Sequence, residues 1–366
     1  MRLFRNDYSE FAAPQIVEAL VAIAAEQSAG YTEEGDAHCE HARELIRAMC
    51  GQDDAMVEFC IGGTSANVIC LNGLLRDWEG VICTPDAHIN VHETGALGAC
   101  GRTVLATTDT DGFLTPEAAE AVWQFQNSCG RHMTLPGAIY ITNATEKGGV
   151  WTRERFDAIC DWARARGLGI FLDGARLGSA LTSEGNDLSL RHIASRVDAF
   201  YLGGTKCGLA MGEAVVICGH TAHAERLREA FPFLQKERCG LLAKGYLLGV
   251  QFERAFAREG VAADGTPWTC EEGEELFWQL ARHANAMAAQ LRRELVEAGF
   301  EPYGESTSNQ QFFVVSDEEA RALEQACGCE TFYTLPGDRR VIRFVCSWAT
   351  TEADVAELVA FAKALR

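Results

Sequence analysis

The sequence predicts an α/β protein in which a mostly parallel sheet is flanked by helices and followed by a smaller C-terminal α+β domain. Between about residues 54 and 218, short apolar runs alternate with longer segments of helical periodicity, as in a parallel sheet covered on both faces. Beyond Pro232 the pattern changes to long helical segments and a second, shorter alternation. We therefore expect a large domain over residues 1–271 and a small domain over residues 272–366, with a hinge at residues 260–267.

Seven short apolar runs are the candidate strands of the large sheet: residues 56–61, 81–84, 103–106, 138–142, 169–172, 199–202 and 214–218. Further elements are helices at 67–78, 116–125, 153–166 (with Thr152 as N-cap), 241–258, 274–298 and 317–327, strands at 311–315 and 341–346, and a last helix from Thr351. Ligands bind such sheets at the carboxyl ends of the strands. Functional residues should therefore follow these runs directly.

Composition excludes several classes of protein. The 366 residues carry 32 basic and 52 acidic side chains, and this net charge of −20 repels nucleic acid and anionic membranes. No apolar stretch approaches the roughly 20 residues of a membrane span, and residues 1–7 lack the apolar core of a signal peptide. Most of the 15 cysteines lie in apolar runs, and Cys327 and Cys329 form a C-x-C motif without a second pair. We expect a cytoplasmic protein without a metal site.

Two strand ends carry the most informative side chains. Lys206 lies in the segment FYLGGTKCG, between glycine-rich turns that let the backbone approach a ligand. Asp173 ends the apolar run GIFLD, and Arg176 follows three residues later. A buried carboxylate needs a compensating partner. The two segments also fit a solvated loop lysine and an internal Asp–Arg ion pair, but together they supply the lysine and the pyridinium partner that a pyridoxal phosphate site requires.

Two further segments follow candidate strands. In IGGTSAN, Gly63 and Thr64 lie where a helix begins, and free N–H groups there suit a phosphate, although a hydroxyl at this place also fits a simple N-cap. His88, in DAHINVHETG, follows another strand; it fits an ordinary surface or core histidine, but this position favours one that lies over a bound ring. The G-x-G-x-x-G pattern of dinucleotide sites is absent, which disfavours a nicotinamide oxidoreductase.

These segments resemble the threonine aldolase family, within the β-eliminating lyase group of fold-type-I pyridoxal-phosphate enzymes. The resemblance covers nearly the whole chain. Its motifs, besides His88 and Arg343, are FRNDY at 4–8, GGT at 62–64, HETG at 92–95, NATE at 143–146, DGAR at 173–176, GTK at 204–206, AKG at 243–245, SNQ at 308–310 and SWAT at 347–350. It implies a fold-type-I, transferase-like arrangement with a seven-stranded sheet.

The resemblance implies a pyridoxal 5'-phosphate site. Lys206 matches the lysine that holds the cofactor, Asp173 the partner of its pyridine nitrogen, and His88 the imidazole stacked on its ring. The phosphate site is matched by Gly63, Thr64 and Ser65.

The resemblance also implies a homodimer or homotetramer with active sites shared between subunits. Lys244 and Arg238 lie in the stretch that, in this family, reaches the cofactor phosphate of the neighbouring subunit. Lys244 fits an exposed helix lysine equally well.

For the substrate, Arg176 and Arg343 match the arginines that hold the carboxylate. Asn6 stands where the family has a serine, and its amide can still donate a hydrogen bond. His132 aligns with a second active-site histidine, so His88 and His132 are the candidate bases for the β-hydroxyl proton.

The implied reaction cleaves the Cα–Cβ bond of L-threonine, L-allo-threonine and related β-hydroxy-α-amino acids to glycine and an aldehyde. β-Elimination or transamination of amino acids on the same scaffold remains open. So does a non-catalytic protein that retains the fold.

Overall fold

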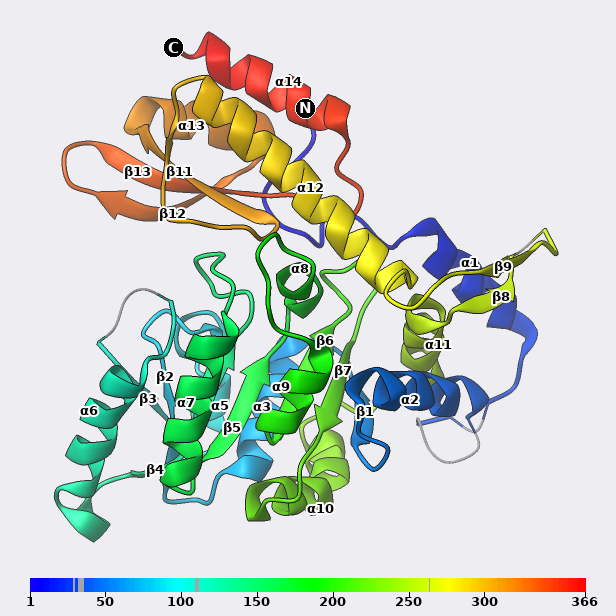
Figure 1. The fold of residues 1–366 in the computed structure, drawn as a ribbon, viewed down its shortest axis with the longest axis vertical. Coiled ribbons are helices and arrows are strands. Elements are labelled where there is room, and N and C mark those ends of the chain that lie inside the picture. Colours follow the sequence, from blue (N-terminus) through cyan, green and yellow to red (C-terminus); the bar gives the residue numbers. More distant parts are fainter. Residues whose placement is uncertain (29, 32–35, 109–111, 263) are drawn as a thin grey trace.

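The computed structural model describes residues 1–28, 30–31, 36–108, 112–262 and 264–366 (Figure 1). Its centre is a seven-stranded sheet with the order β1-β7-β6-β5-β4-β2-β3. The strands are β1 (Met56–Cys60), β2 (Glu79–Cys83), β3 (Thr103–Ala106), β4 (Leu135–Thr142), β5 (Gly169–Asp173), β6 (Ala199–Gly203) and β7 (Glu213–Ile217). Only β7 runs against its neighbours. The predicted mostly parallel, seven-stranded sheet is confirmed.

Helices cover both faces of this sheet because successive strand residues point to opposite sides. In β5, Ile170 and Leu172 enter one apolar core, while Phe171 between them enters the other. The first core is closed by α2 (Ala37–Cys50), α6 (Pro116–Asn127), α7 (Arg153–Ala165), α9 (Leu190–Arg196) and α11 (Tyr246–Phe256). The second core is closed by α3 (Gly63–Leu74), α5 (Ala96–Ala99) and α10 (Ala222–Glu237).

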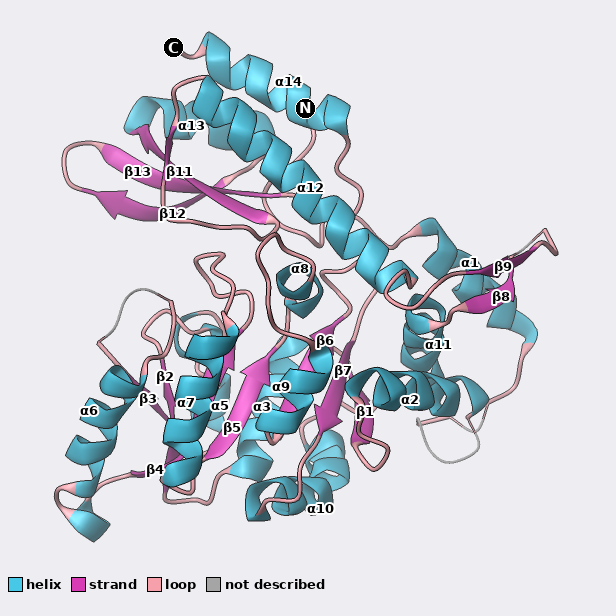
Figure 2. Cartoon of the chain, in the orientation of Figure 1, coloured by secondary structure: helices cyan, strands magenta, loops and turns pink. Residues whose placement is uncertain are grey.

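The C-terminal lobe, from α12 to α14, contains a separate four-stranded antiparallel sheet in the order β10-β11-β13-β12 (Figure 2). Its elements are α12 (Leu276–Glu297), β10 (Glu301–Pro302), β11 (Gln310–Ser316), α13 (Asp317–Cys327), β12 (Glu330–Leu335), β13 (Arg339–Val345) and α14 (Glu352–Ala364). The yellow α12 runs from this lobe down to α11 (Figure 1). The lobe therefore lies above the carboxyl ends of the large sheet.

The N-terminal segment joins the C-terminal lobe. Phe4 is fully buried in the core of that lobe, donates its backbone N–H to Cys327 and accepts from Val345. We predicted that this segment belongs to the large domain, whereas its first residues pack on the smaller lobe. The domain boundary at residue 271 stays a prediction.

Several local features differ from the sequence prediction. The expected hinge at residues 260–267 lies within a hairpin of β8 (Glu259–Val261) and β9 (Pro267–Thr269). The strand β12 was not predicted, because its side chains are only partly buried and its apolar pattern is weak. Two N-terminal helices, α1 (Pro14–Ala22) and α2, were also not predicted. Thr152 caps α7 as expected, since its hydroxyl accepts from the N–H of Arg155.

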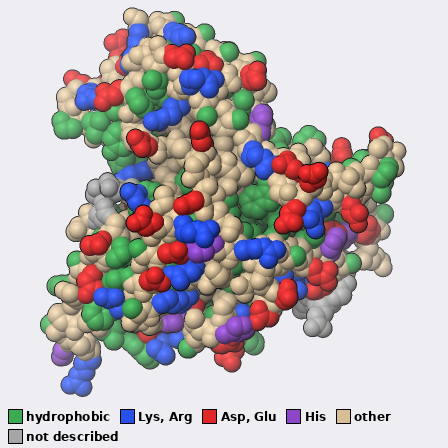
Figure 3. Space-filling view, in the orientation of Figure 1, with side chains coloured by type: hydrophobic (Ala, Val, Ile, Leu, Met, Phe, Trp, Pro, Cys, Tyr) green, Lys and Arg blue, Asp and Glu red, His purple; other side chains and the backbone are tan. Residues whose placement is uncertain are grey.

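Among the described residues, no helix is both long and apolar enough to span a lipid bilayer. The same part of the chain holds no cluster of three or more His, Cys, Asp or Glu side chains arranged to bind a metal ion. All fifteen cysteines are free thiols. On the face shown in Figure 3, acidic and basic side chains are interspersed.

Candidate active site

The carboxyl ends of several strands of the large sheet face the C-terminal lobe (Figure 1). Asp173 is the last residue of β5, Lys206 follows β6, and His88 begins the short helix α4 (His88–Val91) after β2. The parallel strands bring these carboxyl ends to one edge, as the sequence predicted.

Asp173 is a buried carboxylate with a full set of donors. Its Oδ2 accepts from the Tyr140 hydroxyl at 2.5 Å and from Asn67 Nδ2 at 3.0 Å. Its Oδ1 accepts from the Tyr201 hydroxyl at 2.5 Å and from the N–H of Ala175 at 2.9 Å. Burial alone would raise the pKa of Asp173, but these donors outweigh burial and hold it below the ordinary value. Asp173 therefore stays ionised and places a fixed negative charge at the carboxyl end of β5.

A hydrogen-bonded chain joins His88 to this carboxylate. His88 Nδ1 lies 2.8 Å from Glu93 Oε1, which also accepts from Asn67 Nδ2 at 2.8 Å. Burial lowers the pKa of His88, but the bond to Glu93 and the charges of Glu146 and Asp173 raise it above the ordinary value. Because Asn67 donates to both carboxylates, His88 and Asp173 are oriented as one unit.

Lys206 lies with Asp7, Arg176 and Asn309 in the lining of a small pocket. Burial and the nearby charge of Arg176 lower the pKa of Lys206, against the opposing pull of Asp7 and other carboxylates. A lowered pKa leaves more of the amine neutral, which is the form that attacks a carbonyl carbon.

Glu213 stabilises the turn that contains Lys206. It is buried at the start of β7, in register with the last residue of β6, and its Oε2 accepts from the N–H of Gly204 at 2.9 Å. Burial raises the pKa of Glu213 to about 8, while the charge of Lys206 acts in the opposite direction. Sequence reasoning did not single out Glu213.

The N-terminus of α3 is open to a ligand. A Cβ on Gly63 would lie 3.1 Å from the Tyr201 hydroxyl, so the glycine lets the helix end approach the partners of Asp173. The hydroxyl of Ser65 and Nε of Arg238 are both buried without a hydrogen-bond partner among the described residues. Ser65 Oγ lies close to Gly240, two residues beyond Arg238, where a Cβ would be 2.9 Å away. These orphaned donors fit a bound phosphate group.

Arg176 and Arg343, the two predicted carboxylate-binding arginines, are close enough for the charge of one to affect the other. Burial and the charge of Arg176 lower the pKa of Arg343. Arg343 donates to Glu330 Oε2 at 2.8 Å, while its Nε is buried with no hydrogen-bond partner in the described part of the chain. Asn6 directly precedes Asp7, and its Oδ1 accepts from the N–H of Tyr8 at 3.1 Å.

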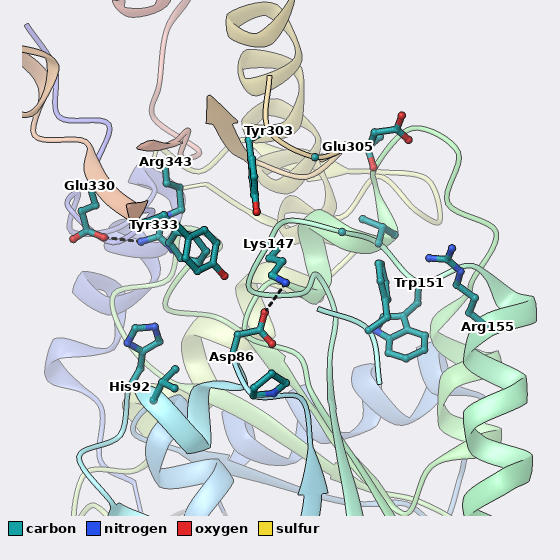
Figure 4. Close-up of a pocket in the computed structure, with 18 of the residues that line it drawn as sticks. Asp86, His92, Lys147, Trp151, Arg155, Tyr303, Glu305, Glu330, Tyr333 and Arg343 are labelled. Atoms are coloured by element: carbon teal, nitrogen blue, oxygen red, sulfur yellow. Dashed lines mark hydrogen bonds and ion pairs between the residues drawn. The ribbon is translucent and has the colours of Figure 1, made fainter. Parts of the chain in front are cut away.

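A cavity of about 1140 Å³ opens beside Arg343, between the sheet edge and the C-terminal lobe (Figure 4). The loops and helices around the large sheet contribute Asp86, His92, Lys147, Trp151 and Arg155 to its lining, and the lobe contributes Tyr303, Glu305, Glu330, Tyr333 and Arg343. The ring of His92 lies 5.5 Å from that of His88. The cavity lining therefore includes Arg343, one of the two predicted carboxylate-binding arginines.

Two predicted residues are not brought to this site by the single chain. His132 ends the short helix η2 (Gly130–His132) just before β4, and it is exposed. A residue before a parallel strand lies at the amino edge of the sheet, opposite Asp173, so the fold places His132 away from the other candidates. Lys244 is exposed in the turn before α11, and no hydrogen bond or ion pair within the described residues joins it to the site. The predicted roles of His132 and Lys244 stay predictions.

Sequence reasoning missed the residues that orient the site. They are Asp7, Asn67, His92, Glu93, Tyr140 and Tyr201. His92 and Glu93 stood within the HETG motif, and the spacing of His88 and His92 by one helical turn could have indicated a histidine pair. The two tyrosines lie inside apolar strands, where nothing in the sequence marks them as partners of Asp173.

Fold and site together define a class of protein: a fold-type-I α/β arrangement with a lysine and a buried aspartate at neighbouring strand ends. The model of the "Beta-eliminating lyase" family matches residues 5–318. A low specificity L-threonine aldolase of a Pseudomonas species is 30% identical over 330 residues, which are 89% of this chain and 86% of that protein. The chain belongs to the threonine aldolase group of the β-eliminating lyase family.

Solved structures agree with this assignment. A threonine aldolase of Leishmania major has a TM-score of 0.90 and 36% identity, with 100% of this chain and 99% of that one covered. An aspartate aminotransferase of Thermus thermophilus shares the fold, with a TM-score of 0.67 at 14% identity, covering 100% of this chain and 91% of that one.

Proposed function

We propose that this protein is a pyridoxal-phosphate-dependent aldolase that cleaves the Cα–Cβ bond of L-threonine, L-allo-threonine and related β-hydroxy-α-amino acids to glycine and an aldehyde. The observation that carries the proposal is the convergence of Lys206, Arg176 and the buried Asp173 at one sheet edge. The threonine aldolases among its relatives support it.

The residues present fit the cofactor. The amine of Lys206 would bond its aldehyde carbon, and Asp173 would hold the proton on its ring nitrogen. The orphaned donors of Ser65 and Arg238, with the N–H groups at Gly63 and Thr64, would hold its phosphate. When bound, pyridoxal phosphate accepts the electron pair released at Cα.

Binding of the substrate carboxylate selects the bond that breaks. Arg343 Nε and the remaining guanidinium N–H groups of Arg176 would supply donors, and the amide of Asn6, the residue before Asp7, would add another. Two charged donors at one carboxylate fix the rotation of the substrate about Cα. The Cα–Cβ bond is then held in the position from which it can break.

Cleavage also needs a group that removes the proton from the β-hydroxyl. His88 and His92 are the candidates, since their rings lie 5.5 Å apart and His92 lines the cavity. His92 takes the place of His132 in this proposal, because His132 lies at the other edge of the sheet. Glu93 would fix which nitrogen of His88 carries its proton.

We also propose that the protein is a homo-oligomer whose active sites are shared between subunits. Large apolar side chains are exposed near the site, with Phe11 67%, Ile61 39% and Met211 41% accessible. Lys244 would reach the phosphate of the neighbouring subunit. The free thiols suit a reducing cytoplasm. Light scattering coupled to size-exclusion chromatography measures the assembly directly.

The reaction is tested by incubating the purified protein and pyridoxal phosphate separately with L-threonine and L-allo-threonine. The proposal predicts glycine and acetaldehyde in equal amounts, and none from the Lys206→Ala variant. Ammonia with a keto acid would instead indicate elimination, and transfer of the amino group would indicate an aminotransferase. No product from any of these assays would indicate a protein without turnover.

A further inference from the structure

Glu213 is a buried carboxylate that the proposed reaction does not use. Its strand β7 lies between β6 and β1 and runs antiparallel to both. In this register Glu213 pairs with Gly203, the last residue of β6, and with Cys60, the last residue of β1. Lys206 follows the first of these strand ends, and the predicted phosphate site at 63–65 follows the second. Glu213 therefore lies where both proposed cofactor-binding segments leave the sheet.

The hydrogen bonds of Glu213 come from the turn that contains Lys206. Its Oε2 accepts from the N–H of Gly204 at 2.9 Å, and its carboxyl group also bonds the side chain of Thr205. The Thr205 hydroxyl accepts from the N–H of Gly212 at 3.0 Å, which leaves its own proton for Glu213. Both donors are neutral, and no lysine, arginine or histidine in the described part of the chain forms an ion pair with Glu213.

The charge of Glu213 can change near neutral pH, unlike the charges of Asp7 and Asp173. Asp7 is paired with Arg176, and Asp173 accepts from tyrosine and amide donors, so both carboxylates have a lowered pKa and stay ionised. Burial raises the pKa of Glu213 to about 8, against the attraction of Lys206. Because this attraction is mutual, an ionised Glu213 also makes the amine of Lys206 harder to deprotonate.

Other charges act on the amine of Lys206 from several elements of the fold. They are Asp7, Glu146, Asp173 and Arg176. Burial and the guanidinium favour the neutral amine and prevail over the three carboxylates, which favour the protonated amine. A change in the charge of Glu213 would alter this balance, because Glu213 hydrogen-bonds the same turn.

We propose that Glu213 is a positioning residue that acts through Lys206: its negative charge keeps a proton on the amine, and the amine becomes neutral when the carboxyl group takes up that proton. The ammonium group loses one proton and the carboxylate gains one, so two charged groups become two neutral groups. The two groups do not form an ion pair, so the proton passes through water. Only the neutral amine can bond a carbonyl carbon. This inference rests on the proposed role of Lys206 in binding the cofactor.

The test measures the protonation of Lys206 in the apoprotein. Acetic anhydride acetylates neutral amines, and mass spectrometry of the peptide that contains Lys206 gives its extent between about pH 6 and about pH 10. We expect the midpoint in Glu213→Gln to lie about one pH unit below that of the unmodified protein, since loss of a nearby opposite charge favours the neutral amine. The amide oxygen still accepts from Gly204, so the turn keeps this hydrogen bond.

Glu58→Gln is the matched control. Glu58 is a second largely buried carboxylate, on the neighbouring strand β1, and it pairs with Arg43 instead of the Lys206 turn. This variant should leave the midpoint unchanged. Glu213→Leu removes both the charge and the hydrogen-bond acceptor, so it should lower the midpoint and also weaken the binding of pyridoxal phosphate by about tenfold in an absorbance titration.

An unchanged midpoint in Glu213→Gln overturns the proposal, and so does an equal shift in Glu58→Gln. Circular dichroism verifies that each variant is folded, and Glu213→Gln decides the question even if Glu213→Leu does not fold. Acetylation is measured without cofactor or substrate. Failure of this inference is therefore distinguishable from failure of the aldolase proposal, which is measured by L-threonine cleavage in the unmodified holoenzyme.

Discussion

Arg176 and Asp7 form a two-point ion pair across 169 residues of sequence. Nε of Arg176 donates to Oδ2 at 2.7 Å, and Nη2 donates to Oδ1 at 3.0 Å. Asp7 also accepts from Asn309 Nδ2 at 2.9 Å. The pair therefore ties the N-terminal segment and the C-terminal lobe to the strand end that carries Asp173.

Loss of this pair should destabilise the protein strongly. Asp7→Asn leaves the buried Arg176 without its counter-charge, and breaking a buried pair typically costs about 3–5 kcal/mol of unfolding free energy. Urea unfolding of the apoprotein at neutral pH measures the loss. Asp161→Asn removes the largely exposed partner of Arg196 and is the control, expected to change stability by less than about 1 kcal/mol.

The stability lost in the Asp7→Asn variant should depend on pH. Burial alone would raise the pKa of Asp7, but Arg176, Lys206 and the hydrogen bonds bring it below the ordinary value of 3.8. A carboxyl with a lowered pKa stabilises the fold above its unfolded pKa and loses that effect as the pH falls through its folded pKa. The difference in unfolding free energy between the unmodified protein and the Asp7→Asn variant should therefore shrink below about pH 4. An equal difference at all pH values would contradict the charge-based explanation.

Glu93→Gln should lower the pKa of His88. The hydrogen bond and charge of Glu93 help to keep this imidazole protonated to a higher pH than burial alone allows. The histidine ring proton resonances of the apoprotein, followed by NMR against pH, give the midpoint directly. We expect a lower midpoint in Glu93→Gln, with the other resonances unmoved. An unchanged His88 midpoint would remove Glu93 from this role.

Asp173→Asn should abolish most turnover, because an amide cannot supply the charge that holds the proton on the cofactor ring nitrogen. We expect kcat to fall by at least about a hundredfold, as when a single strong electrostatic contact is removed from an active site. Tyr201→Phe removes one donor and keeps the carboxylate, so its effect should be much smaller. Equal losses in the two variants would argue that Asp173 acts only through its hydrogen bonds.

The histidines give a direct test of the proposed base. His92→Asn or His88→Asn should lower kcat by roughly a hundredfold or more if the altered ring takes the β-hydroxyl proton. His132→Asn should stay within about twofold of the unmodified enzyme, since His132 lies at the opposite edge of the sheet. A large loss in His132→Asn would contradict the choice of His92 over His132.

The sequence predicted which residues lie at the strand ends, but it did not predict the side chains that contact those residues. Apolar runs marked β5 and β6, so Asp173 and Lys206 were placed by local pattern alone. His132 was assigned by residue type and alignment, although its position before β4 puts it at the amino edge. Contacts such as Asp7 with Arg176 and Tyr201 with Asp173 join distant segments, and periodicity carries no information about them.

The attachment of the cofactor to one amine is the central claim. The holoenzyme is reduced with borohydride, digested and mapped by mass spectrometry. The account predicts a pyridoxyl-phosphate adduct on the peptide that contains Lys206. An adduct confined to another lysine, or no adduct after incubation with pyridoxal phosphate, would contradict it.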